Sequence, residues 1–179
     1  MMFTAATELG TTQRIEVLLG KSLESPILIL VFINGLMALG RLYAGPIVHK
    51  LSITKVLLFS AIFSCLGLFL LANTSGAMTF LAAAVFAIGV CYFWPTMLSF
   101  VSEKIPESGA LGLSLMGGAG MLSVSFVLPQ MGKLMDSNTT GSELLLLYAY
   151  IPAILIVAFL ILHIYVCLLY TSPSPRDRH

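Results

Sequence analysis

Long apolar runs separated by short polar segments dominate the chain. Five runs are close to the ~20 residues that a membrane-spanning helix needs. No charge occurs between Lys55 and Glu103, but the turn-forming NTSG (Asn73–Gly76) divides that stretch. The runs are uniformly apolar, which favours helices over barrel strands. The pattern predicts an all-α membrane protein with five transmembrane helices, roughly Pro26–Val48, Val56–Leu71, Met78–Val101, Ala110–Gly132 and Leu144–Val166.

The composition supports this prediction. Of the 179 residues, 58% are hydrophobic and 9% are charged, whereas soluble domains carry about 25% charged residues. The net charge of +1 comes without a basic cluster interleaved with aromatics, so we expect no nucleic-acid partner. No metal-ligand spacing, catalytic Ser/His/Asp or Cys/His set, or phosphate-binding loop is present. We therefore expect no metal, no cofactor and no enzymatic activity.

The connections between the runs are short, so residues 25–166 are expected to form one bundle in the lipid bilayer. Arg41, Lys50 and Lys55 surround the first connection, which the positive-inside rule places in the cytoplasm. Alternation then places 102–109 inside and 136–143 outside. Residues 1–24 are expected to be the end of a helix followed by an outer loop.

Two apolar runs contain polar or aromatic groups that admit two interpretations. Arg41, in NGLMALGRLYAGP, is either a snorkelling arginine on a glycine-rich packing face or a gating residue. Tyr92, Trp94 and Pro95 lie near the middle of their run, which favours a cavity lining over an interfacial aromatic belt. Pro95 removes a backbone donor and is expected to kink the helix.

The fourth run and the N-terminus also carry candidate functional residues. Gly117, Gly118 and Gly120, followed by Pro129, fit either a bendable helix or a close helix contact. Glu8 is either a proton-coupling or solute-binding carboxylate or an ordinary outer-loop acid.

Four stretches resemble the major facilitator superfamily of transporters. GRLYAGPIVHKLS resembles the short basic loop between the second and third helices of a half, without its usual Asp, which is typical of the second half. YFWPTMLSFVSEKIP and MGGAGMLSVSFVLPQMGKLMD are similar to the tenth and eleventh helices of sugar-type members related to fucose permease. TELGTTQ is similar to the outer end of the seventh helix.

The resemblance implies most of the C-terminal six-helix half of that fold, with the five runs as helices eight to twelve. It implies alternating access for a small polar solute such as a sugar, with proton coupling, together with an N-terminal half that this chain lacks. It also implies a bacterial cytoplasmic (inner) membrane. The substrate-path residues would be Glu8, Thr12, Gln13, Asn34, Tyr92, Trp94 and Pro95. The gating-loop residues would be Gly40, Arg41, Gly45 and Lys50.

Two other classes of protein remain open. A stand-alone helical membrane subunit or scaffold would pack against partners through its glycine faces. A small oligomeric channel would need polar residues repeated along one helix face. The tail is a separate matter, because CLLYTSPSPRD (Cys167–Asp177) is identical to translated sequencing-adapter DNA. We interpret 167–179 as adapter-derived and expect it to carry no function.

Overall fold

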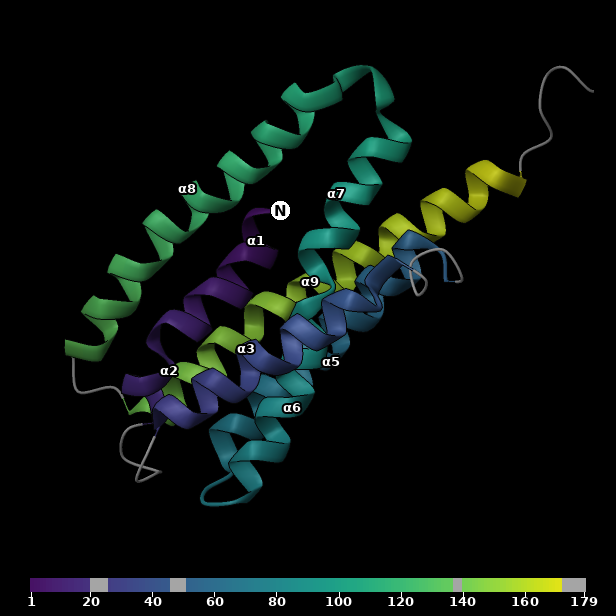
Figure 1. Cartoon of the computed structure of the whole chain (residues 1–179). Helices are drawn as coiled ribbons and strands as arrows, with labels where there is room; N and C mark the ends of the chain where they lie inside the picture. Colours follow the sequence, from purple (N-terminus) through teal and green to yellow (C-terminus); the bar gives the residue numbers. More distant parts are fainter. Residues whose placement is uncertain (20–25, 46–50, 137–139, 172–179) are drawn as a thin grey trace, which may run out of the picture.

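The computed structural model describes residues 1–19, 26–45, 51–136 and 140–171. The described residues form a bundle of helices (Figure 1). The helices are α1 (Met2–Ala5), η1 (Ala6–Gly10), α2 (Thr11–Leu19), α3 (Pro26–Leu42), α5 (Ile53–Asn73), α6 (Met78–Cys91), α7 (Phe93–Lys104), η2 (Pro106–Ser108), α8 (Gly109–Asp136) and α9 (Gly141–Thr171).

Four described helical segments are long and apolar enough to cross a membrane: Ile53–Asn73, Met78–Glu103, Pro106–Leu134 and Gly141–Leu168. The fifth expected span is a shorter apolar helix, Ile27–Leu42, in the described part of the chain. The prediction of an all-α membrane protein is therefore confirmed. The last helix continues to Thr171 rather than ending at Val166, because Leu168–Tyr170 remain apolar and the next proline is Pro173.

The turns between helices depend on local backbone chemistry. Gly76 takes a φ of 66° in the turn between α5 and α6, and Gly109 takes a φ of 48° before α8. Such positive φ values are readily adopted only by glycine. The long apolar run after Gly76 is interrupted at Tyr92, where α6 ends and α7 begins. Pro95 accounts for this interruption because it removes one donor from the helical ladder.

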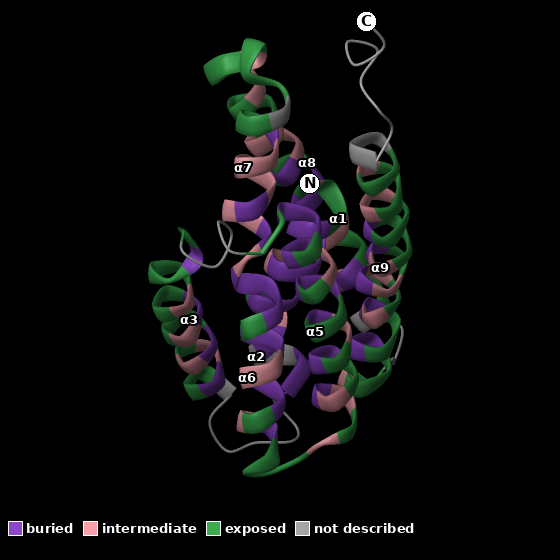
Figure 2. Cartoon of the chain, turned by 90° about the vertical axis from the view of Figure 1, so that its right-hand side faces the viewer, coloured by how far each residue is buried: buried purple, intermediate pink, exposed green. Residues whose placement is uncertain are grey.

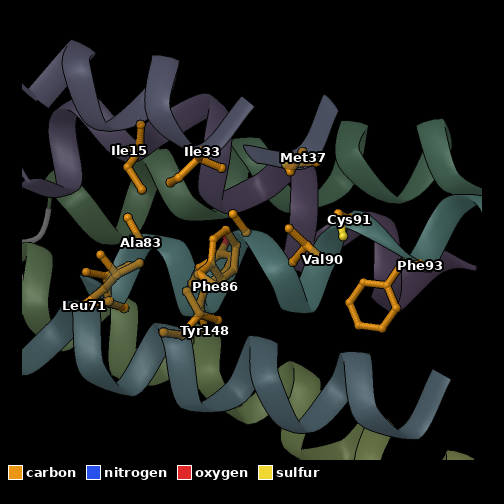
Figure 3. Close-up of a cluster of buried hydrophobic side chains, with 14 of the residues drawn as sticks. Ile15, Ile33, Met37, Leu71, Ala83, Phe86, Val90, Cys91, Phe93 and Tyr148 are labelled. Atoms are coloured by element: carbon orange, nitrogen blue, oxygen red, sulfur yellow. The ribbon is translucent and has the colours of Figure 1, made fainter. Parts of the chain in front are cut away.

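The core lies around α6, which packs against α3 on one side and α5 on the other, while α5 also packs along α9. Phe86 and Phe93 are fully buried in this cluster. Figure 3 shows Phe86 and Val90 of α6 facing Ile33 and Met37 of α3. The outer faces of α3 and α9 are largely exposed in Figure 2, as expected for helices whose apolar outer side meets lipid.

Two glycines allow α5 and α6 to approach through their backbones. A Cβ atom on Gly67 would overlap backbone atoms of Phe86, and one on Gly89 would overlap the backbone of Ser64. Small residues at such crossings let membrane helices pack closely. A hydrogen bond of 2.8 Å between Thr54 Oγ1 and His163 Nδ1 joins α5 to α9 farther along the bundle.

The N-terminal segment, Met2–Leu19, is helical throughout and lies inside the bundle. Its α1 part contacts α8, and its α2 part contacts α3 and α9. Thr4, Thr7, Thr11 and Thr12 on this segment are buried, as is Glu8. Figure 1 shows α8 on the far side of this segment from α3 and α5. A polar stripe thus runs along a helix that other helices surround.

Candidate functional site

A hollow of about 460 Å³ lies where the N-terminal helix, α3, α7 and α8 meet. We call it the Glu8 hollow. Its lining combines an acid, a base, an indole ring and small or flexible apolar groups. The lining residues are Glu8, Leu9, Arg41, Trp94, Gly117 and Met121.

A π-helical turn, η1, positions Glu8. The turn occupies Ala6–Gly10 and has Glu8 at its centre. In a π-helix the backbone hydrogen bonds run from residue i to i+5, and such turns are frequent at functional sites. The Thr7 hydroxyl donates to the Phe3 carbonyl at 2.9 Å, and the Thr12 hydroxyl donates to the Glu8 carbonyl at 2.7 Å. These side chains therefore add donor partners for one backbone carbonyl before the irregular turn and one within it.

Glu8 and Arg41 form a salt bridge across the hollow. Arg41 Nη2 lies 2.6 Å from Glu8 Oε1, and the side chains are 42% and 4% exposed, respectively. Opposite charges inside apolar helices pair because an isolated charge there is costly. The second carboxylate oxygen, Glu8 Oε2, is buried and has no hydrogen-bond partner among the described residues. One oxygen of the Glu8 carboxylate thus lacks a hydrogen-bond donor among the described residues.

Arg41 has a second hydrogen-bond partner, which belongs to the neighbouring helix α6. Arg41 Nε donates to the backbone carbonyl of Cys91 at 3.3 Å, at the end of α6. Arg41 lies within α3, one residue before the helix ends, which agrees with the predicted span Pro26–Val48, and its gating role stays a prediction. Its guanidinium group meets a residue from the N-terminal helix and one from α6.

The predicted substrate-path residues do not all lie together in space. Glu8 and Trp94 both line the Glu8 hollow, and Pro95 follows Trp94 on α7. Tyr92 lines a different, wholly apolar groove of about 250 Å³ between α5 and α6. Tyr92 and Trp94 are two positions apart, which places them on nearly opposite sides of a helix with 3.6 residues per turn.

Three other predicted path residues do not line the hollow. Thr12 is buried and bonds its own helix, whereas Gln13 is exposed. Asn34 is also exposed, and its amide donates to the Leu30 carbonyl of the same helix at 2.8 Å.

The predicted gating and packing residues also take distinct positions. A Cβ on Gly40 would lie 3.0 Å from Cys91 Sγ, so this glycine lets α3 approach α6. Gly45 is exposed with open space around it, and Lys50 lies outside the described residues.

The glycines of α8 also differ from one another in what surrounds them. Gly117 lines the hollow, while a Cβ on Gly120 would lie 3.4 Å from Trp94 Cη2. A Cβ on Gly117 or Gly118 would meet no described atom within 4 Å. Pro129 lies inside the continuous helix α8.

Several features of the site were not predicted from the sequence. Leu9 and Met121 complete the lining, and the Cys91 carbonyl anchors Arg41. The sequence did contain one signal for the ion pair, because Glu8 and Arg41 are an acid and a base in apolar surroundings. In the described part of the chain, no group of three or more His, Cys, Asp or Glu side chains could hold a metal ion.

The fold is therefore a bundle of apolar helices with one acid and one basic side chain paired at a largely apolar hollow. The chain belongs to the Major Facilitator Superfamily, whose family model matches residues 4–179. It is therefore a transporter-type integral membrane protein, and members of this superfamily are transporters rather than enzymes. No curated protein and no solved structure matched the chain.

Proposed function

We propose that the Glu8 hollow binds a small, hydroxyl-rich solute such as a sugar, as part of a secondary transporter. The observation that carries this proposal is the buried, unpartnered Glu8 Oε2 beside the half-exposed Arg41 and the Trp94 ring. A hydroxyl group can donate to the carboxylate and accept from the guanidinium. The indole can cover an apolar C–H face, and the volume lies within the roughly 300–1,000 Å³ typical of small-molecule sites.

The finer assignments are parts of the same proposal. The similarity of the Tyr92–Pro106 and Met116–Asp136 stretches to fucose-permease-like members supports a sugar and a bacterial cytoplasmic membrane. Proton symport would use Glu8, the acid in the hollow. Residues 167–179 are proposed to be adapter-derived because of the identical translation, so Cys167 would have no functional role.

Trp94 provides the test, because it is the single tryptophan of the chain and lines the hollow. We expect its fluorescence to change saturably when sugars are titrated into the chain reconstituted in lipid nanodiscs. Gly117→Leu should weaken the apparent affinity at least about tenfold, because the new side chain extends from a lining position with open space around it.

The matched control is Gly118→Leu, which makes the same change at the neighbouring glycine. Gly118 also has open space around it but does not line the hollow, so its affinity should be unchanged. Equal affinities for the two variants would contradict the proposed site. If no sugar or polyol gave a saturable response, the stand-alone subunit or scaffold would become the better interpretation. Repeating the titration at several pH values tests proton coupling. If Glu8 is the coupling acid, Glu8→Gln should remove the pH dependence of the apparent affinity.

We further propose that a second helical half completes the transport path. The hollow is open on one side, where Met121 is 61% exposed and the Arg41 side chain is 42% exposed. Alternating access requires two bodies that rock around the site. The chain reconstituted alone in liposomes should therefore show no saturable sugar uptake, measured with radiolabelled solute. Saturable uptake above that of empty liposomes would refute this part of the proposal.

A further inference from the structure

The carbonyl of Cys91 lacks its usual helical partner. In an α-helix this carbonyl would accept the N–H of the fourth following residue, but that residue is Pro95, which has no N–H. The ladder resumes one position later, where Thr96 N–H donates to the Tyr92 carbonyl at 3.1 Å. The break between α6 and α7 therefore leaves one specific carbonyl to be satisfied from elsewhere.

Arg41 satisfies that carbonyl from another helix. Its Nε donates to Cys91 O at 3.3 Å, while its Nη2 donates to Glu8 Oε1 at 2.6 Å. Gly40, the preceding residue, lets α3 lie close enough, since a Cβ there would be 3.0 Å from Cys91 Sγ. One guanidinium group thus joins the acid of the hollow to the break in the α6–α7 helix.

We propose that Arg41 is a positioning residue that couples the charge of Glu8 to the bend between α6 and α7. While Glu8 is ionised, it holds the guanidinium group against the Cys91 carbonyl. When a proton or a bound solute neutralises Glu8, that hold weakens. The Arg41 side chain, already 42% exposed, turns into the hollow, and the carbonyl loses its donor. An unpaired carbonyl in apolar surroundings is costly, so the helix changes its bend.

The consequence for the hollow follows from the position of Trp94. This residue lies on α7, just beyond the break, and forms one wall of the hollow. A change of bend at Tyr92 moves that wall relative to Glu8. The coupling is independent of the solute's identity, so it can be tested without transport.

Distance measurements between two spin labels report the bend directly. Leu81 on α6 and Ser102 on α7 are exposed and flank the break. Nitroxide labels on Leu81→Cys and Ser102→Cys should lie about 30 Å apart, which suits double electron–electron resonance. The background replaces Cys65, Cys91 and Cys167 by alanine, which keeps the carbonyl at position 91. The whole chain is reconstituted in nanodiscs, and circular dichroism checks the helicity of every variant.

Glu8→Gln and Arg41→Met are each measured with Pro95 present and in a Pro95→Ala background, which gives four variants. Glu8→Gln and Arg41→Met should each shift the label distance by several ångströms when Pro95 is present. Pro95→Ala restores the N–H donor to the carbonyl, so neither substitution should shift the distance in that background. A shift in Arg41→Met alone would overturn the coupling and leave Arg41 as a simple cap. Unchanged distances in both variants, or equal shifts with and without Pro95→Ala, would overturn the proposal, because a merely structural ion pair does not depend on residue 95.

Discussion

Replacing Gly89 with alanine should destabilise the bundle by about 2 kcal/mol, within the range for overpacked cores. The added Cβ would overlap the backbone of Ser64 on α5. Backbone atoms cannot rotate away as the end of a flexible side chain can, so α5 and α6 must separate. Their separation would loosen the packing around Phe86 of α6, which is fully buried. Unfolding in sodium dodecyl sulfate titrations, followed by circular dichroism, measures the change.

The control for Gly89→Ala is Gly35→Ala. Gly35 lies within α3, and a Cβ there would meet no described atom within 4 Å. Alanine is a better helix former than glycine by up to about 1 kcal/mol, so Gly35→Ala should leave stability unchanged or slightly higher. If the two variants unfolded at the same detergent concentration, the close approach of α5 and α6 at Gly89 would be disproved.

The helices of this chain could be predicted because the signal for them is strong and local. Charge gaps and turn residues such as Asn73–Gly76 delimit apolar runs whose length matches a bilayer. The interruption near Pro95 followed from the missing N–H alone. The π turn around Glu8 was not predicted, because apolar periodicity does not reveal a shift from i→i+4 to i→i+5 hydrogen bonds.

Contacts between helices were harder to predict, because they depend on which faces meet. The cluster of Gly117, Gly118 and Gly120 fits a close helix contact by sequence. The tight backbone crossing of α5 and α6 instead uses the isolated Gly67 and Gly89. A glycine's neighbours along the chain do not show what lies opposite it. Among the described residues, a Cβ on Gly117 or Gly118 would meet nothing.

In the site, too, single residues could be predicted from the sequence, but the contacts between distant residues could not. Glu8, Trp94 and Pro95 were singled out as substrate-path candidates, and the first two line one hollow. Arg41 falls inside the predicted span Pro26–Val48, but the sequence pattern does not indicate which residue it pairs with. Its ion pair with Glu8 joins residues that are 33 positions apart, and only the packing of α3 against the N-terminal helix brings them together.

Replacing Arg41 with methionine should cost about 3 kcal/mol, the lower end of the range for removing one member of a buried ion pair. The lower end applies because the Arg41 side chain is 42% exposed, whereas that of Glu8 is only 4% exposed. Methionine keeps the apolar stem but removes the charge, so the Glu8 carboxylate is left buried without its cation. Detergent titration followed by circular dichroism measures the loss.

Removing Glu8 and removing Arg41 should not cost the same free energy of unfolding. Glu8→Gln leaves a half-exposed cation that can turn toward water in the hollow, so it should cost clearly less than Arg41→Met. The double variant Glu8→Gln, Arg41→Met should recover much of the loss, because no uncompensated buried charge remains. Equal costs for the two single variants, or additive costs in the double variant, would show that burial of the Glu8 charge is not what makes Arg41 necessary.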